Sequence, residues 1–456
     1  MRLSVVGSAL LSSLILSAAH ARADEAPPSL EQRIEDLEQQ HRILLRQLEL
    51  EHEAAAEEAK KKISVSAGAS GFVIRTANNA FALKLRGLVQ IDGRAFFGDG
   101  KNALPDTFLP RRVRPIIEAT FFGIVDVKIM PDFGNNTVAL DDAYVDLHPF
   151  AWLRLRAGKM KPPIGLERLQ SAANILFIER AFPTALVPNR DVGAYLWGEI
   201  ANGAFIYQVG VFNGIADGAL APDIDLHDGK ELVARVFGHP FRPLRHWAVE
   251  NLGFGVAGSY GNERGTAAAP NLPTLKSPGQ FNFFTYLADA TKPDGTALAG
   301  GTRYRISPQL YWYIDRVGLM AEYVRSAQDV KKGTEVRTVG NQAWQVSLSV
   351  LLTKDKASYD GVKPNKPFDY EFKGAGAWEL AARYEEITID DTAFPLFADD
   401  SKSARQARGF GVALNWYLNQ NARLAINYEH TNFTGGAVKG DRAPEDALLG
   451  RLQVSF

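Results

Sequence analysis

Hydrophobic and polar residues alternate along most of the chain from residue 63 to the C-terminus. The longest runs cover residues 83–97 and 112–130, and similar runs follow at 142–157, 252–260, 344–352, 378–385, 410–418 and 448–456. A period of two places successive side chains on opposite faces of a β-strand, so each run predicts a strand with one apolar and one polar face. Strands of a soluble β-sandwich have about five or six residues, and the two longest runs greatly exceed that length. The pattern therefore favours a transmembrane β-barrel, in which lipid-facing and lumen-facing residues alternate.

A different period precedes the strands. Apolar positions and one histidine recur at alternating steps of four and three, at Leu30, Ile34, Leu37, His41, Leu44 and Leu48. This is the heptad pattern of a coiled coil. A seam of two residues per heptad would bury little against a globular core, which favours a short coiled coil over a lone amphipathic helix. Residues 24–62 are therefore predicted to form a periplasmic coiled-coil helix, which either trimerises or contacts the cell wall.

The first twenty-three residues have the features of a secretory signal peptide. Arg2 precedes an apolar run over residues 3–16, and Ala21-x-Ala23 offers a small-residue cleavage site. Residues 1–23 are thus predicted to be removed on export. A spanning helix needs about 20 continuous apolar residues, which neither this run nor any later one supplies. If the chain lies in a membrane, the pattern leaves a barrel as its form.

Composition limits the chemistry of the chain. A length of 456 residues suits either two or three soluble domains or one large barrel. There is no Cys, and the eight His form no HExxH or other tight cluster, so neither a metal nor another cofactor is predicted. No GxSxG motif or Ser/His pair suggests an enzyme, and GxGxxG at residues 253–258 lies within a strand. The formal net charge of −1 supplies no global field for a nucleic-acid partner.

Six arginines fall on the polar faces of strands predicted in the first third of the chain. They are Arg86, Arg94, Arg112, Arg114, Arg154 and Arg156. Guanidinium groups that point into one lumen would attract anions and hold oxyanions through paired hydrogen bonds. Arg111 has the opposite parity and is predicted at the mouth of its strand. The alternative is a structural ladder, in which acids on the same faces, including Asp132, neutralise the arginines.

Two lysines mark the end of the regular pattern in this region. Lys159 and Lys161 share the parity of Leu153 and Leu155, which would aim them into lipid. Because charge in lipid is costly, the strand is predicted to end or to bulge before Lys159. Residues 162–188 lack a strand or helix period, and their apolar residues favour a loop that folds inward as a constriction. Longer outer loops are predicted at the polar inserts around 263–279, 291–302, 353–374 and 390–407.

Five stretches match one known family. They are LKLRGLVQIDGRAFF at 83–97, RRVRPIIEATFFG at 111–123, DAYVDLHPFAWLRLRAGKMKPPIGLERLQS at 142–171, FIERA at 177–181 and NGIADGALAPDIDLHDGKELVARVFGHPF at 213–241. In these stretches the chain resembles the phosphate-selective porin O and P family. The resemblance implies a trimeric barrel of about sixteen strands, with basic lumen residues that bind phosphate or polyphosphate near an inward-folded loop.

The resemblance also assigns particular residues. By motif position, Arg94, Arg111, Arg112 and Lys159 match the family's basic set, and Asp132 matches an acidic neighbour. The resemblance places Arg111 in the lumen, where strict alternation places Arg112, and a β-bulge at the strand start would reconcile the two. Fewer lysines lie towards the mouth than in the phosphate-specific members.

These observations give one hypothesis and its rivals. The chain is predicted to be all-β: a signal peptide at 1–23, a coiled-coil helix at 24–62, and an antiparallel outer-membrane β-barrel at 63–456 with a constriction loop near 162–188. Its predicted function is a bacterial outer-membrane porin for small hydrophilic solutes that favours anions such as phosphate. Predicted partners are outer-membrane lipid and two further copies in a homotrimer. The alternatives are a non-selective porin and a structural barrel that tethers the envelope. The predicted anion site comprises Arg94, Arg111, Arg112, Arg114, Arg154, Arg156, Lys159, Lys161 and Asp132.

Overall fold

The computed structural model describes residues 29–97, 105–222, 225, 228–289, 291–292, 294–371 and 373–456. The chain divides into two compact units, residues 1–62 and residues 63–456. The predicted signal peptide at 1–23 lies outside the described residues.

The described part of the first unit forms one helix, α1 (Leu30–Lys61). Its first turn begins with a reciprocal cap, because the Gln32 N–H donates to Ser29 Oγ and the Ser29 N–H donates to Gln32 Oε1. The seam positions are exposed, with Leu30 at 80% and Leu37 at 64% of full exposure. The predicted helix is confirmed, and its assembly into a coiled coil stays a prediction. No helix in the described part of the chain is long and apolar enough to cross a membrane.

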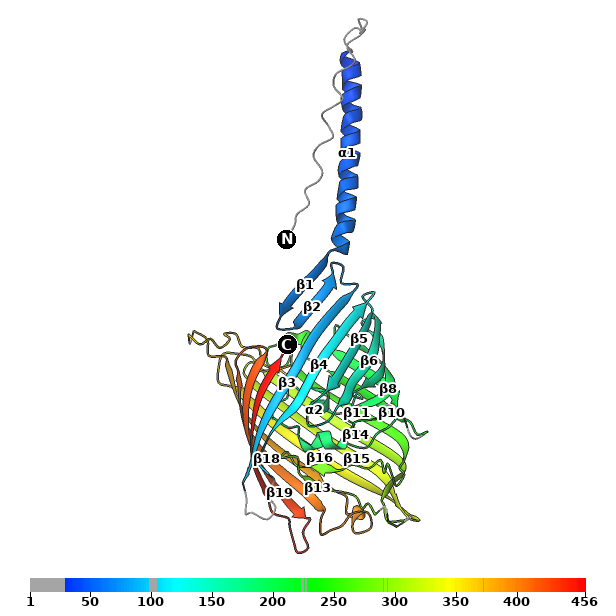
Figure 1. Cartoon of the computed structure of the whole chain (residues 1–456), viewed down its shortest axis with the longest axis vertical. Helices are drawn as coiled ribbons and strands as arrows, with labels where there is room; N and C mark the ends of the chain where they lie inside the picture. The colour runs from blue at the N-terminus through cyan, green and yellow to red at the C-terminus, as the bar shows by residue number, and fades with distance from the viewer. Residues whose placement is uncertain are drawn as a thin grey trace, which may run out of the picture. The chain divides into compact units, whose positions relative to one another are not determined.

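The second unit is a closed antiparallel barrel (Figure 1). Eighteen of its described strands form one sheet, and a separate pair of short strands lies in one connection. After the hairpin β1 (Ile63–Gly68) and β2 (Gly71–Thr76) is set aside, sixteen strands close the barrel. They are β3 (Ala82–Phe97), β4 (Thr107–Phe121), β5 (Val125–Asp132), β6 (Ala139–Phe150), β7 (Leu153–Met160), β8 (Asp191–Ile200), β9 (Phe205–Phe212), β10 (Glu231–Gly238), β11 (Leu252–Arg264), β14 (Leu298–Ile314), β15 (Val317–Lys332), β16 (Glu335–Leu351), β17 (Ala377–Thr388), β18 (Ala404–Tyr417), β19 (Ala422–Gly435) and β20 (Glu445–Ser455). The sixteen-strand barrel implied by the resemblance is confirmed.

The seam of the barrel lies between β3 and β20. Leu88 to Phe97 of β3 pair with Ser455 to Asp446 of β20, and the preceding residues of β3 pair with β2. The last residue completes the ladder, because the backbones of Gly87 and Phe456 exchange hydrogen bonds of 2.8 and 3.0 Å. The ring of Phe456 also contacts Phe72 of β2 edge to face. The C-terminus is therefore anchored to β3 just beyond the residues that pair with β2.

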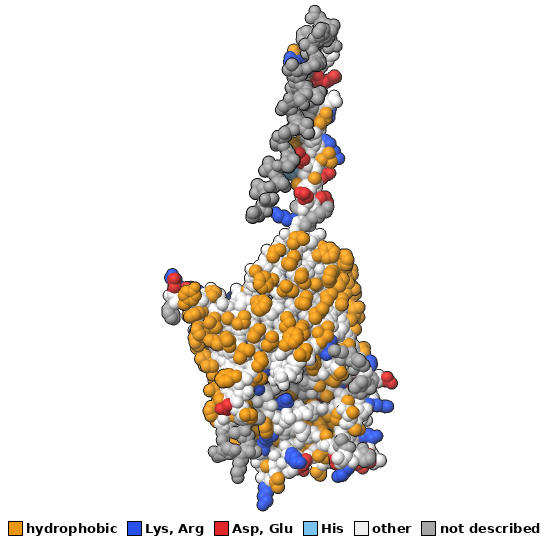
Figure 2. Space-filling model, viewed as in Figure 1, with side chains coloured by type: hydrophobic (Ala, Val, Ile, Leu, Met, Phe, Trp, Pro, Cys, Tyr) orange, Lys and Arg blue, Asp and Glu red, His pale blue; other side chains and the backbone are white. Residues whose placement is uncertain are grey.

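The two faces of the sheet differ as the alternation predicts. On β14, Tyr304 and Ile306 are 40% and 45% exposed on the outer face, whereas Arg303 and Arg305 are buried on the inner face. Figure 2 shows hydrophobic side chains spread over the visible outer face of the barrel, with charged side chains gathered at the end that carries β13 (Asn282–Phe284). An apolar outside and a polar inside are what a barrel in lipid requires.

One predicted outer loop lies at the other end of the barrel. We call the end where β3 begins and β20 ends the terminus end, and the opposite end the loop end. Because β16 runs towards the terminus end, the connection 352–376 lies there, so placing 353–374 among the outer loops was wrong. This connection turns inward, where its backbone groups find partners. Periodicity could not show this, because the direction of a connection depends on how many strands precede it.

Two connections at the loop end also pack inward. Residues 265–297 include β12 (Leu275–Lys276) and β13, and residues 389–403 include the 3-10 helix η3 (Asp391–Ala393). The Phe284 ring lies 5.9 Å from the Phe394 ring, and both residues belong to a buried apolar cluster. Apolar surface of the connections is thereby removed from water inside the barrel.

Gly158 offers a test of the β6–β7 pairing. Its φ is +130°, and a Cβ there would lie 2.2 Å from the backbone oxygen of Ala143 on β6. We expect Gly158→Ala to destabilise the barrel by about 1–3 kcal/mol, because both the backbone conformation and the close approach favour glycine. Denaturant unfolding in detergent micelles measures this change. Gly450→Ala is the control, since a Cβ there meets no atom within 4 Å, and an equal loss in both variants would contradict the prediction.

Candidate functional site

A long segment between β7 and β8 lies inside the barrel. This inner segment, residues 161–190, contains the short helix α2 (Leu166–Leu169) and the 3-10 helix η1 (Phe182–Leu186). Many of its side chains are fully buried, among them Ile164, Ile175 and Phe177. Phe182 packs against Phe283 of the loop-end connection, with ring centroids 5.8 Å apart. The segment is therefore part of the barrel interior.

Side chains on the inner face of the wall hold the backbone of the inner segment. Gln90 of β3 donates to the Ala172 carbonyl, and Gln453 of β20 donates to that of Ala173, each at 3.0 Å. Similar contacts reach the segment from β15 to β19, through Glu322, Glu385, Asn415 and Arg423. Irregular backbone at membrane depth is tolerated only with such partners. The segment thus lines the β15–β20 side of the wall.

The connection 352–376 braces the inner segment from the terminus end. The Tyr359 hydroxyl donates to the Leu166 carbonyl at 2.7 Å, and Gln170 Nε2 donates to the Tyr359 carbonyl at 2.7 Å. Asn174 Nδ2 donates to the Asp360 carbonyl at 2.7 Å. Tyr359 also stacks on Tyr311 with centroids 4.9 Å apart. The inner segment is consequently held by the wall and by a second connection.

Two predicted site residues, Arg94 and Arg111, bind an acid of the inner segment. The Glu179 carboxylate accepts hydrogen bonds from Nε and Nη2 of Arg111 at 2.6 and 3.1 Å, and from Nη2 of Arg94 at 2.8 Å. The Glu179 side chain is 4% exposed. Burial alone would raise the pKa of the Glu179 carboxyl, but Arg111 and Arg94 lower it well below its ordinary value. This cluster is a clamp that fixes the inner segment to β3 and β4.

A β-bulge places Arg111 and the next residue on the same side of the wall. In the β3–β4 ladder Gln90 pairs with Arg112 and Ile91 pairs with Pro110, so Arg111 is the extra residue. Arg112 is buried, and its Nη1 donates to Gln90 Oε1 at 2.8 Å. The bulge that reconciles alternation with the resemblance is therefore present.

Two further predicted residues, Arg114 and Asp132, pair with each other. Arg114 binds Asp132 at 2.8 Å and Asp141 at 2.6 Å. Asp132 also accepts the backbone N–H groups of Val113 and Gly134, each at 3.0 Å. Asp132 thus stabilises the turn after β5 and neutralises Arg114. This part of the predicted set resembles the structural ladder that was the alternative.

Arg154 and Arg156 lie among aromatic rings on β6 and β8. The Arg154 guanidinium is 4.4 Å from the Trp197 centroid, and that of Arg156 is 4.5 Å from Tyr144. Arg156 also pairs with Asp146 through Nε at 2.8 Å and through Nη2. Such stacking is a favourable cation–π contact.

The two lysines at the end of β7 have different surroundings. The strand continues to Met160, so the prediction that it ends before Lys159 was wrong, and the ladders on both sides run through Lys159 without a register shift. Lys159 avoids lipid because it is buried, 7% exposed, next to the unusual backbone of Gly158. Lys161 donates to the carbonyls of Leu169 and Gln170 at 3.3 and 2.9 Å. Burial and the nearby charges of Arg180 and Arg190 lower the pKa of Lys161 well below its ordinary value.

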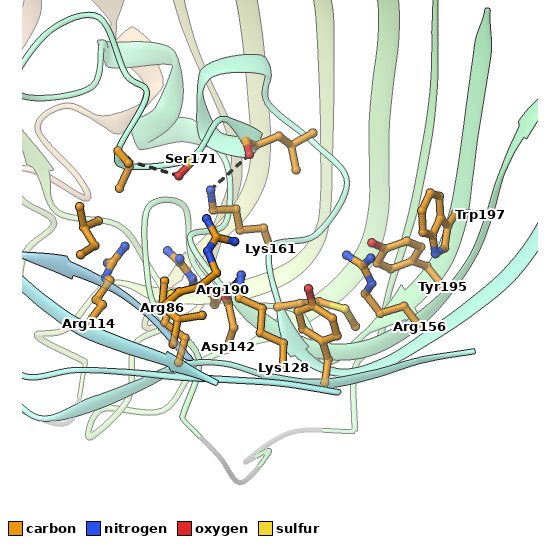
Figure 3. Close-up of a pocket in the computed structure, with 18 of the residues that line it drawn as sticks. Arg86, Arg114, Lys128, Asp142, Arg156, Lys161, Ser171, Arg190, Tyr195 and Trp197 are labelled. Atoms are coloured by element: carbon orange, nitrogen blue, oxygen red, sulfur yellow. Dashed lines mark hydrogen bonds and ion pairs between the residues drawn. The ribbon is translucent and has the colours of Figure 1, made fainter. Parts of the chain in front are cut away.

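A cavity of about 420 Å³ lies between the inner segment and the β3–β10 side of the wall. Its charged lining consists of seven basic residues and one acid, namely Arg86, Arg114, Lys128, Arg156, Lys161, Arg190, Arg235 and Asp142. Figure 3 shows most of these side chains turned towards a common space, with Lys161 reaching in from the side of the inner segment. The structure therefore brings Arg114, Arg156 and Lys161 together from the predicted set. Arg94, Arg111, Arg112, Arg154, Lys159 and Asp132 are not among the residues that line it.

Sequence reasoning missed several residues of this cavity. Lys128 and Arg235 occupy inward positions of alternating strands, so parity contained a signal for both. Arg190 is the last residue of the inner segment, where the sequence has no strand or helix period, so the sequence contained no signal for it. Arg190 bridges Asp142 and Asp141 at 3.1 and 3.4 Å. Arg235 binds only neutral oxygens among the described residues, those of Gln309 and Gln208 at 2.9 and 3.1 Å.

Comparisons with known proteins agree with this architecture. The family described as "Phosphate-selective porin O and P" matches residues 83–456. Porin O of Pseudomonas aeruginosa is 24% identical over 428 residues, which are 85% of this chain and 91% of that protein.

Solved outer-membrane proteins share the fold. The trimer form of OmpT from Vibrio cholerae matches with a TM-score of 0.51 and 10% identity, over 83% of this chain and 100% of that one. The outer-membrane channel DcaP of Acinetobacter baumannii matches with a TM-score of 0.52 and 12% identity, over 83% and 98%. At such low identity these likenesses show the fold alone.

The Glu179 clamp can be tested by removing its charge. We expect Glu179→Gln to destabilise the protein by about 3–5 kcal/mol, because buried Arg111 would lose its ion-pair partner and Arg94 would keep only Asp92, at 3.5 Å. Denaturant unfolding measures the loss, and single-channel recordings should show added current noise from a loosened inner segment. Glu118→Gln is the control, since its pair with Arg86 is partly exposed and should contribute no more than about 1 kcal/mol. Equal effects of the two variants would contradict the clamp.

Proposed function

Since the chain belongs to the phosphate-selective porin O and P family, whose members reside in the bacterial outer membrane, we propose that it forms a diffusion channel that favours anions. The observation that carries this proposal is the charge lining of the cavity, seven basic residues against one acid. In a narrow, partly dehydrated passage, fixed cationic groups attract anions and repel cations.

The basic residues of the cavity divide into two groups. Most have acidic partners, as Arg114 has Asp132 and Lys128 has Asp142, which lies at 3.2 Å. Lys161 and Arg235 pair only with neutral oxygens among the described residues. No acid among the described residues forms an ion pair with either side chain, so these two are the residues on which anion preference depends most.

The mechanism that we propose is guided diffusion with no covalent step. The inner segment fills the β15–β20 side of the barrel and acts as the constriction, so solutes pass along the β3–β10 side. Asp142 lies beside Lys128 and Arg190 and competes for both. Such competition keeps an anion from binding too tightly to leave, and conduction requires release as well as entry.

Phosphate is the candidate solute that the family's name suggests. The cavity supports an oxyanion because guanidinium groups offer paired hydrogen-bond donors. Because the Arg94, Arg111 and Asp132 contacts are internal, the site that we propose lies beyond them, at Lys161, Arg190 and Arg235.

We further propose that three copies assemble in the membrane and that α1 contributes to the assembly. The exposed apolar seam of α1 supports this, and so does the trimer form of the related OmpT fold. Three heptads are marginal alone, so the barrel would provide most of the association energy.

Anion preference is tested by reversal potentials in planar bilayers under asymmetric KCl. We expect the reversal potential to have the sign that indicates a preference for chloride over potassium. Lys161→Gln combined with Arg235→Gln should lower the chloride-to-potassium permeability ratio about fivefold, the effect of roughly 1 kcal/mol of lost electrostatic attraction. Arg408→Gln, on the outer face of β18, is the control. Cation preference in the unmodified channel would refute anion selection, and no preference would favour the non-selective porin.

The seam of α1 is tested by cross-linking, which the absence of native Cys makes simple. Leu37→Cys places one thiol in the seam of each copy, and mild oxidation should join copies efficiently, because seam positions face each other in a coiled coil. Gln39→Cys lies on the opposite face and should cross-link little. Equal cross-linking of the two variants, on denaturing gels, would contradict a coiled coil.

A further inference from the structure

Aromatic rings gather around one guanidinium group on the terminus-end side of the cavity. The Arg156 guanidinium carbon lies 4.5 Å from the Tyr144 centroid, 5.6 Å from Tyr195 and 5.3 Å from Trp197. All four residues line the cavity. Figure 3 shows Tyr195 and Trp197 beside Arg156, with Lys128, Arg190 and Lys161 farther along the same space.

These rings exceed what a small inorganic anion needs. Phosphate and chloride interact with ammonium and guanidinium groups and leave aromatic faces unused. Apolar side chains extend the same wall, including Ile116, Met130 and Ile206. A passage for hydrated inorganic ions alone would gain nothing from this apolar surface, because water would have to cover it.

We propose that the cavity binds organic anions that carry an aromatic ring, with aromatic carboxylates as the simplest members. This inference deepens the proposed function, on which it rests. The ring lies against Tyr144, Trp197 and the Arg156 guanidinium, and the carboxylate faces Arg190 and Lys161.

The hydrogen bonds of the site leave room for such a ligand. Asp146 accepts hydrogen bonds from Nε and Nη2 of Arg156. Among the described residues, no group accepts a hydrogen bond from Nη1 of Arg156. The Arg156 side chain is 23% exposed. Among the described residues, Lys161 donates to two carbonyls alone, and carbonyls are weaker partners for an ammonium than a carboxylate.

Charge and size select against other classes of ligand. Seven basic residues against one acid disfavour an aromatic cation. A neutral aromatic compound would offer Lys161 and Arg190 no negative charge to bind. The volume of about 420 Å³ lies in the range of roughly 300–1,000 Å³ that is usual for small-molecule sites.

The experiment measures block of the KCl current through the full-length channel by benzoate, acetate, inorganic phosphate and neutral benzamide. We expect benzoate to half-block at a concentration about tenfold lower than acetate, because its ring adds stacking and cation–π contacts. Benzamide should block far less than benzoate. Tyr144→Leu and Trp197→Leu should each reduce the benzoate-to-acetate ratio about threefold or more.

Two control variants separate the ring from general effects. Tyr144→Phe keeps the ring and should keep the preference for benzoate. Trp344→Leu removes an outer-face aromatic and should change nothing. Equal block by benzoate and acetate, equal block by benzamide and benzoate, or a preference that survives both leucine variants would overturn the inference. The KCl reversal potential of the same channels reports the proposed anion preference separately.

Discussion

Pairing of every backbone polar group is the constraint on which this structure depends. In lipid an unpaired N–H or C=O has no water to bind, so a spanning sheet must close on itself. Here closure joins β3 to β20, and the backbone of Phe456 completes it at Gly87. The same constraint explains the interior. The inner segment has little regular structure, and side chains such as Gln90, Gln453 and Tyr359 supply the partners that its backbone lacks.

Ionic groups then divide the interior into a packed part and an open part. The Glu179 carboxylate gathers Arg94 and Arg111, and the inner segment is thereby fixed to the wall beside the seam. Arg94 and Arg111, which the resemblance assigned to the basic set, are thus occupied within the protein. The basic residues that line the cavity come from β3, β4, β5, β7 and β10 and from the two ends of the inner segment. A residue that matches the family's motif is therefore not always a residue whose charge is available to a solute.

Alternation predicted the barrel well because lipid imposes it on every spanning strand. It failed where the backbone departs from a regular strand. At Arg111 an extra residue shifts the register, and at Gly158 a positive φ precedes a lysine whose parity points to lipid. Alternation also could not predict which acids pair with the arginines, because partners such as Arg111 and Glu179 are 68 residues apart in the sequence. The connection 352–376 was misplaced because its direction follows from the number of strands before it, a global property of the barrel.

The packing of the inner segment makes the width of the passage partly independent of the circumference of the barrel wall. The number of strands sets the circumference of the wall, yet connections from both ends fill much of the enclosed volume. The width of the passage accordingly depends on the side chains of these connections as well as on the number of strands. One wall can thus accommodate a family of passages of different calibre, and divergence between relatives can concentrate in connections while the lipid-facing surface stays the same.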